Sequence, residues 1–271
     1  MSLVTSLLPF VLGLAVTGCI SGFLAGLLGV GGGIVVVPVL YIVLAAFDVD
    51  ADLIPYIAVG TSLATIIPTS FQSIRAHRAR GAVDGALLKW WGPFVALGVI
   101  FGVLIAGWAD GELLTLVFGI VAVIVAAHML LTPEGTHLSD GLPSRPLQTV
   151  LAVLIGTIST LMGIGGGTLT VPILSLFAYP VRRAVGTASV VGLIIALPGA
   201  LGFVINGWGA AGLPPFSIGY VNGVGFILIA CTSMFFAPLG AKVAHTIDPR
   251  WLRRLFGLFL AITSAKMLTS L

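Results

Sequence analysis

The sequence predicts an all-α polytopic membrane protein made of two inverted repeats. Each repeat is expected to contain a broken, re-entrant hairpin at a glycine-rich motif and three transmembrane helices. Three observations support this prediction: composition, a duplicated set of motifs, and the distribution of charge. Of the 271 residues, 58% are hydrophobic and 8% are charged, whereas soluble domains have about 25% charged residues. Apolar runs of about 20 residues recur along the chain, as in membrane-spanning helices.

The apolar segments follow one another with short polar connections. They lie at 3–46, 53–74, 83–108, 112–131, 147–178, 184–205, 216–240 and 251–270. The longest polar stretch is residues 132–146, at the centre of the chain. We therefore predict a first membrane repeat at 1–131, a central cytoplasmic loop at 132–146 and a second, inverted repeat at 147–271. No basic residue precedes the first apolar run, so we expect no cleaved signal peptide.

The chain contains an internal duplication. Three motifs occur twice in the same order: "GVGGGIVVVP" at 29–38 and "GIGGGTLTVP" at 163–172, "AVGTS" at 58–62 and "AVGTA" at 184–188, "FGI…AAHML" at 118–130 and "FGL…SAKML" at 256–268. The copies are separated by similar distances of 134, 126 and 138 residues. Internal repeats of this kind, parallel or inverted, are typical of secondary transporters.

The distribution of basic residues decides between parallel and inverted repeats, because Lys and Arg concentrate in cytoplasmic loops. If every apolar segment crossed the membrane once, eleven of the twelve Lys and Arg residues would divide five against six. If each glycine-motif segment enters and leaves on one side, all eleven face the cytoplasm, and only Lys266 does not. This arrangement inverts the repeats and places both termini outside the cytoplasm, in a cell (inner) membrane.

The glycine triplets are expected at the bends of the two hairpins. The arms after them, at about 34–46 and 168–178, would be about 17–20 Å long, shorter than the roughly 30 Å hydrocarbon core. Glycine permits a positive φ and leaves its N–H group accessible, and a helix that starts there attracts anions. Two such helix starts would face one central cavity. Close helix packing is the alternative role of these glycines; we favour it for the ladders Gly18–Gly22–Gly26 and Gly98–Gly102, and the binding role for the triplets.

The predicted substrate-binding residues are the two triplets and the hydroxyls in or beside duplicated motifs. They are Gly31, Gly32, Gly33, Thr61, Ser62, Gly165, Gly166, Gly167, Thr168, Thr187 and Ser189. Membrane hydroxyls often bond to their own helix, and this alternative stays open for the four in the "AVGT" segments. Thr168 could cap the arm or contact substrate. Gln72, His77 and Asn206 could line the cavity, but for them we favour solvation in loops.

Motifs of enzymes and metal sites are missing from the sequence. It has no CxxC, HExxH, GxSxG or Walker-type lysine motif, and no carboxylate pair within a predicted span. We therefore predict no catalytic residues, no metal site and no cofactor. Despite a pI of about 9.1, no nucleic-acid partner is expected, because the basic residues lie in short loops. The predicted partners are a small anionic substrate and the lipid bilayer; homo-oligomer formation is left open.

The doubled "GxGGGxxxxP" pattern with its "AVGTS"-type segments resembles the sulfite exporter TauE/SafE family, also called the 4-toluene sulfonate uptake permease family. The resemblance covers nearly the whole chain. It implies a transporter for sulfur-containing anions such as sulfite, thiosulfate or organosulfonates. With it we expect export of the anion, held at the two glycine bends near the membrane midplane. The alternatives are a passive anion channel with the same site, or an intramembrane enzyme or assembly factor.

Overall fold

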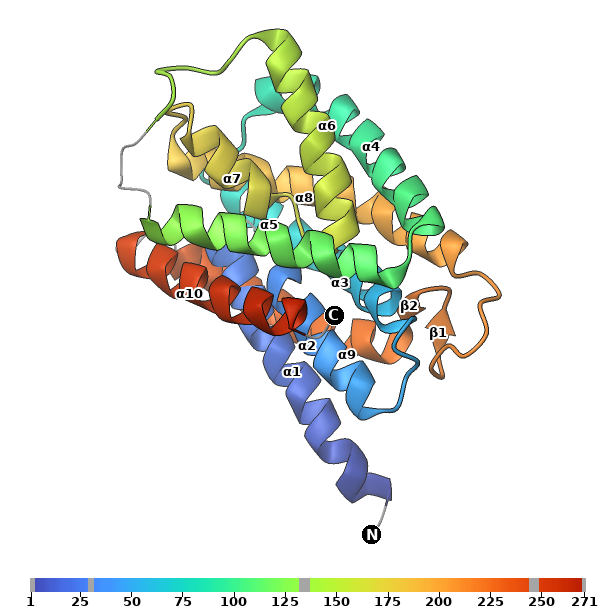
Figure 1. Ribbon diagram of the computed structural model, residues 1–271. Coiled ribbons are helices and arrows are strands. Elements are labelled where there is room, and N and C mark those ends of the chain that lie inside the picture. The colour runs from blue at the N-terminus through green and yellow to red at the C-terminus, as the bar shows by residue number, and fades with distance from the viewer. Residues whose placement is uncertain (1–2, 29–31, 132–136, 244–248, 270–271) are drawn as a thin grey trace.

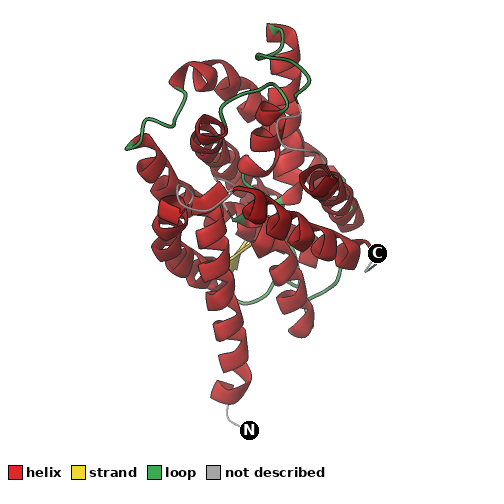
Figure 2. Ribbon diagram, turned by 90° about the vertical axis from the view of Figure 1, so that its left-hand side faces the viewer, coloured by secondary structure: helices red, strands yellow, loops and turns green. Residues whose placement is uncertain are grey.

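The computed structural model describes residues 3–28, 32–131, 137–243 and 249–269. Within these ranges the chain forms ten helices and one short antiparallel strand pair (Figures 1 and 2). The elements are α1 (Leu3–Leu28), α2 (Gly33–Ala46), α3 (Ile54–Arg78), α4 (Gly85–Trp108), α5 (Gly111–Leu131), α6 (Arg145–Met162), α7 (Gly167–Ser175), α8 (Val181–Asn206), β1 (Ser217–Ile218), β2 (Val221–Asn222), α9 (Gly223–Val243) and α10 (Pro249–Leu268). The predicted all-α class is confirmed.

Six helices, α3, α4, α5, α6, α8 and α9, are long and apolar enough to cross a membrane. The chain is therefore a multi-pass membrane protein. By contrast, α2 has 14 residues and α7 has nine, which gives lengths of about 21 and 14 Å. Both follow a glycine motif, as predicted for the hairpin arms. The second arm ends earlier than expected, because the chain turns at Ala178, with φ of 53°, just before Pro180.

The helices of the two halves pack against each other in corresponding pairs. When the duplicated motifs are aligned, α1–α5 correspond to α6–α10. α1 packs along α9 as α6 packs along α4, while α3 packs on α8 and α5 on α10. Figure 1 shows the α5 and α10 pair side by side. The packing pattern is thus unchanged when the halves are exchanged. The division of the chain at 132–146 stays a prediction.

Glycines allow the closest of these helix contacts. A methyl group at Gly22 of α1 would lie 2.4 Å from the Ser233 carbonyl oxygen of α9. At the corresponding position in the second half, a methyl group at Gly156 of α6 would lie 2.2 Å from the Val95 carbonyl oxygen of α4. A methyl group at Gly98 would meet α6 in the same way. The prediction that the glycine ladders pack helices is confirmed.

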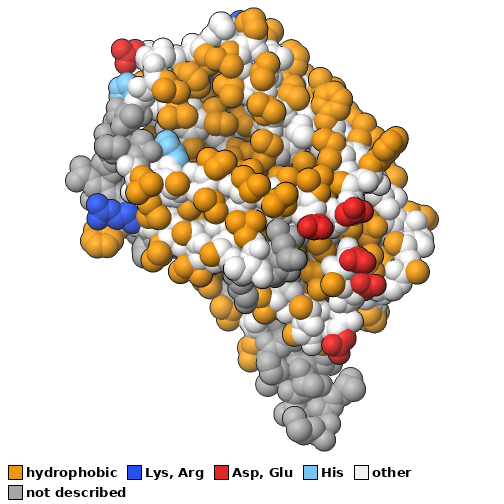
Figure 3. All heavy atoms as spheres, in the orientation of Figure 1, with side chains coloured by type: hydrophobic (Ala, Val, Ile, Leu, Met, Phe, Trp, Pro, Cys, Tyr) orange, Lys and Arg blue, Asp and Glu red, His pale blue; other side chains and the backbone are white. Residues whose placement is uncertain are grey.

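The connections between helices gather at two opposite ends of α3. At its start, Tyr56 stacks on Tyr220 with ring centroids 4.9 Å apart, and its hydroxyl donates a hydrogen bond to the Ala109 carbonyl. Beyond its other end, Asp84 forms an ion pair with Arg183. In Figure 3 most of the visible acidic side chains lie along the right side of the face; another lies at the upper left, the side that also carries visible basic side chains. Three connections therefore meet at the start of α3, and the ends carry different charge.

Candidate functional site

The two glycine bends lie next to each other beside the middle of α3. A methyl group at Gly33 would lie 2.5 Å from the Gly163 carbonyl oxygen and 2.9 Å from Ser62 Oγ and Ile66 Cδ1. The Ser62 hydroxyl donates a 2.6 Å hydrogen bond to the Gly163 carbonyl. The start of α2, the end of α6 and the centre of α3 therefore meet at one point inside the protein.

The backbone turns differently in the two motifs. Gly32, the N-cap of α2, has φ of 77°, and Gly163, the C-cap of α6, has φ of 65°. These left-handed values favour glycine. Gly166, the N-cap of α7, has an ordinary helical φ of −55°, so the left-handed turn in the second motif precedes its triplet. Gly31 lies outside the described residues.

The second bend packs against the middle of α8. A methyl group at Gly166 would lie 2.5 Å from Val191 Cγ1, while the neighbouring Gly165 and Gly167 are buried. At Gly192 the surroundings are less crowded: a methyl group there would lie 3.4 Å from Ser70 Oγ and 3.6 Å from the Gly166 nitrogen. A helix has no internal partner for its first N–H groups. The Ser70 hydroxyl and the Gly166 amide thus both lie beside the place that a methyl group on Gly192 would occupy.

The four predicted hydroxyls of the "AVGT" segments are hydrogen-bonded within the protein. Thr61 Oγ1 accepts a 2.8 Å bond from the Asn222 N–H, and Thr187 Oγ1 accepts a 3.0 Å bond from the Asp84 N–H. Ser189 donates to the Gly186 carbonyl at 2.7 Å, and Ser62 donates to Gly163. These hydroxyls connect backbone segments. As substrate contacts they stay a prediction.

Other buried hydroxyls have no hydrogen-bond partner. They are Ser70 and Ser73 in α3, Ser159 in α6, and Thr168 and Thr170 in α7. Each of these residues is 2% exposed or less. An unpaired buried hydroxyl costs about 1–3 kcal/mol, so such groups indicate a partner such as a ligand or an ordered water. Of the five, the sequence prediction included only Thr168. One visible signal was missed: "TLT" follows the second triplet where "IVV" follows the first.

The site is made of neutral groups. No Lys, Arg, Asp or Glu side chain is buried in the part of the chain that the structure describes. His77 is 2% exposed, with Nε2 3.3 Å from the Gly26 carbonyl oxygen, so its predicted loop solvation is wrong. Asn206 donates a 2.9 Å hydrogen bond to the Val103 carbonyl, and Gln72 is partly exposed. Hydroxyls and backbone amides are therefore the donors near the two bends.

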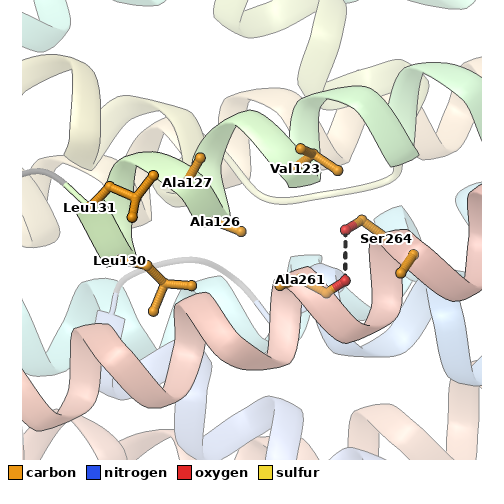
Figure 4. A pocket seen from close by; sticks show the side chains of 8 residues that line it. Val123, Ala126, Ala127, Leu130, Leu131, Ala261 and Ser264 are labelled. Carbon is orange, nitrogen blue, oxygen red and sulfur yellow. Dashed lines mark hydrogen bonds between the residues drawn. The ribbon is translucent and has the colours of Figure 1, made fainter.

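A cavity of about 260 Å³ lies elsewhere, between α5 and α10 (Figure 4). Its walls are apolar except for Ser264, whose hydroxyl already donates a 3.0 Å hydrogen bond to the Ala261 carbonyl. Val123 and Leu130 contribute side chains from α5. The cavity offers an anion no free donor, so we do not place the substrate there.

Comparison with known proteins identifies the family. A family model described as "Sulfite exporter TauE/SafE" matches residues 14–267. The chain belongs to this family. A probable membrane transporter protein of Haemophilus influenzae is 32% identical over 259 residues, covering 95% of this chain and 98% of the relative. A probable membrane transporter protein of Methanocaldococcus jannaschii is 29% identical over 263 residues, covering 94% of each. No solved structure matches the chain.

Membership in the TauE/SafE family, together with the six long apolar helices, makes the chain a membrane transporter and not an enzyme. The alternative of an intramembrane enzyme is therefore rejected. The resemblance predicted from the duplicated motifs is confirmed over nearly the whole chain.

In this TauE/SafE chain the duplicated threonines bind the N-caps of two corresponding helices. Asn222 precedes α9, and its Oδ1 accepts a 2.9 Å bond from the Gly225 N–H. Asp84 precedes α4, and its Oδ1 accepts bonds from the N–H groups of Ala86 and Leu87 at 2.9 and 3.1 Å. Thr61 and Thr187 hold the backbone N–H groups of these caps. Each copy of the "AVGT" motif thus fixes the start of a helix in the other half of the chain. Thr61 fixes the start of α9, and Thr187 fixes the start of α4.

The two caps differ in charge. Asp84 Oδ2 lies 3.2 Å from Arg183 Nη2 and accepts a hydrogen bond from the Tyr179 hydroxyl. Burial raises the pKa of the Asp84 carboxyl, but the hydrogen bond from Tyr179, the N–H groups of α4 and Arg183 together lower it further, so the pKa lies below its ordinary value. Burial and the hydrogen bond to Asp84 raise the pKa of Tyr179. Asp84 is therefore ionised at neutral pH.

Replacing Asp84 by Asn should preserve the cap of α4, because Asn222 caps α9 at the corresponding position. The variant should lose the ion pair, which contributes at most about 1 kcal/mol near a surface. A carboxylate whose pKa is lowered by folding stabilises the protein above its unfolded pKa of about 3.9 and loses this effect as the pH falls through its folded pKa. The melting-temperature difference between wild type and Asp84→Asn should therefore be constant near neutral pH and shrink on acidification below about pH 4. A difference that persists at lower pH would contradict this account.

Proposed function

We propose that this TauE/SafE transporter exports small sulfur-containing anions, such as sulfite, thiosulfate or organosulfonates, and holds them at the glycine bends near the membrane midplane. The observation that carries the proposal is the set of buried, unpaired hydroxyls around the bends. Thr168 and Thr170 lie in the helix that starts at the second bend, and Ser70 lies beside its Gly166. A passive anion channel with the same site is the alternative.

The chemistry of the proposed substrates fits these donors. A sulfonate group is a tetrahedral oxyanion whose oxygens accept several hydrogen bonds at once. The first N–H groups of α7 are not paired within the helix and carry its partial positive charge. In transporters with broken helices, the N-termini of half-helices point at anionic substrate groups. The two glycine bends lie beside the middle of α3 and α8, which supports a site near the middle of the membrane.

We also propose that the repeats are inverted, with both termini outside the cytoplasm of a cell (inner) membrane. The contacts between connections support this topology. Asp84 contacts Arg183, and the Leu138 N–H donates a 2.7 Å bond to the Leu176 carbonyl. These pairs join connections that would lie on opposite sides if every apolar segment crossed the membrane once. The terminal residues 1–2 and 270–271 lie outside the described ranges.

The proposed direction follows from the membrane potential. A monovalent anion that leaves an interior-negative cell gains about 2.3 kcal/mol per 100 mV. A proton-coupled carrier commonly uses an intramembrane carboxylate, and the described helices bury no Asp or Glu side chain. Export of an anion along the electric field needs no such group.

Thr168→Val tests the proposal, because it removes the unpaired hydroxyl and keeps the shape of the side chain. The variant in proteoliposomes should bind and transport sulfite or methanesulfonate at least about tenfold more weakly, consistent with loss of one hydrogen bond to a charged group. Its melting temperature should stay constant or rise. Thr263→Val is the matched control: its hydroxyl bonds to the Phe259 carbonyl in its own helix, so transport should not change.

If Thr168→Val transports the anion as well as the wild type does, the proposed site is contradicted. The concentration dependence of the same fluxes separates the two mechanisms: saturable flux supports a carrier, and flux that rises in proportion to concentration supports the channel.

A further inference from the structure

The two glycine bends offer different donors, although their sequences are duplicated. Beside the described part of the first bend, the Ser62 hydroxyl already donates its hydrogen bond to the Gly163 carbonyl. The apolar residues Ile34 and Val35 follow the first triplet. After the second triplet come Thr168 and Thr170, both buried and unpaired. The duplication has preserved the glycine triplet but neither the backbone turn nor the hydrogen-bonding groups around it.

The free donors at the second bend converge from separate elements. Ser70 Oγ of α3 and the Gly166 nitrogen at the start of α7 lie 3.4 and 3.6 Å from one point, the position of a methyl group at Gly192 of α8. Among the described residues outside Gly192, its two chain neighbours and the nearby backbone of α8, no atom lies closer to that point. A methyl group on Gly192 would therefore sit in ordinary contact with both the Ser70 hydroxyl and the Gly166 amide, which come from two different helices.

The Lys and Arg side chains that the structure describes lie at the surface of the protein. Every Lys and Arg side chain that the structure describes is exposed, and the ion pair of Asp84 and Arg183 lies beyond the end of α3. The cost of moving an ion out of water rises with the square of its charge, so a dianion costs about four times as much as a monoanion of equal size. Neutral donors without a buried cation are suited to offset one negative charge.

We infer that the transporter has a single oxyanion site, at the second glycine bend, which takes singly charged tetrahedral anions and excludes doubly charged ones. Alkylsulfonates and hydrogensulfite belong to the first class, and sulfate and thiosulfate to the second. Ser70, Thr168 and the Gly166 N–H are the donors. This inference rests on the proposed function and narrows its substrate class.

The experiment measures binding of methanesulfonate and sulfate to the purified full-length protein by calorimetry, at one pH and one ionic strength. Methanesulfonate should bind with one molecule per chain, and sulfate should bind at least about tenfold more weakly, because of its second charge. Gly192→Ala should weaken methanesulfonate binding at least about tenfold, since its methyl group fills the position between the donors without a close clash. Ser70→Ala should weaken binding in the same direction.

Gly92→Ala is the matched control, because its methyl group would also make only an ordinary contact, 3.5 Å from Ile194 Cδ1. Both glycine variants should keep the wild-type melting temperature, and Gly92→Ala should bind methanesulfonate normally. Unchanged binding in Gly192→Ala and Ser70→Ala would overturn the position of the site, and two molecules per chain would overturn its being single. If the wild type binds sulfate as tightly as methanesulfonate, and Gly192→Ala weakens the binding of both, only the selection by charge is overturned. If the wild type neither binds nor transports any sulfur anion, the proposed function itself fails.

Discussion

Gly22→Ala and Gly156→Ala should each lower the melting temperature of the purified protein strongly. The added methyl groups would lie 2.4 Å from the Ser233 carbonyl oxygen and 2.2 Å from the Val95 carbonyl oxygen. Because these neighbours are backbone atoms, only separation of the packed helices relieves the clash. Overpacking of this kind costs about 1–3 kcal/mol, occasionally more.

Gly13→Ala in α1 is the control, since nothing lies within 4 Å of its added methyl group. It should leave the melting temperature unchanged or raise it, because Ala favours a helix over Gly. Gly22 and Gly156 occupy corresponding positions in the two halves, so their variants should lose similar amounts of stability. Equal melting temperatures for Gly22→Ala and Gly13→Ala would show that α1 and α9 do not approach as closely as described.

Four single-cysteine variants should divide into two classes when intact cells are treated with a membrane-impermeant thiol reagent. In a background with Cys19 and Cys231 replaced by Ala, Asp50→Cys and Trp208→Cys should be labelled, and Asp140→Cys and Arg182→Cys should be protected until the cells are opened. All four native side chains are exposed, so accessibility reports the side of the membrane. The difference is expected to be all or none.

The pairs in this experiment are chosen to separate the two topologies. If every apolar segment crossed once, positions 50 and 208 would lie on opposite sides, as would positions 140 and 182. Labelling of only one member of either pair would exclude the inverted hairpins. Labelling of 140 and 182 with protection of 50 and 208 would keep the hairpins but reverse the protein in the membrane.

The helices could be predicted from the sequence because they follow from composition. Apolar runs bounded by polar connections predict spans, and the predicted segment 53–74 corresponds to α3 at Ile54–Arg78. Its last turn was missed, since Arg75 and Arg78 are polar, yet their side chains reach the surface from a helix that continues beneath them. The short arms were predictable from the glycine triplets that precede them and from the ends of the apolar segments.

The partners of the hydroxyls could not be predicted, because they depend on which helices approach each other. Thr69 and Ser70 are neighbours in α3 and similar in chemistry. Thr69 nevertheless bonds to the Thr65 carbonyl and to Ser233 of α9 at 2.7 and 2.9 Å, whereas Ser70 has no partner. Likewise, the duplication pointed to Thr61 and Thr187 as site residues. The N–H groups from which they accept hydrogen bonds lie 161 and 103 positions away in the sequence, so these partners could not be predicted.

The hydrogen bond from Ser62 to the Gly163 carbonyl has a consequence for folding. Its donor belongs to the first half of the chain and its acceptor to the bend of the second. A half that folded alone would leave the Gly163 carbonyl without this donor, and an unpaired carbonyl inside the protein costs free energy. Each half would also expose the glycine faces that its counterpart covers. The two halves, although duplicated, therefore complete one another and form a single cooperative folding unit.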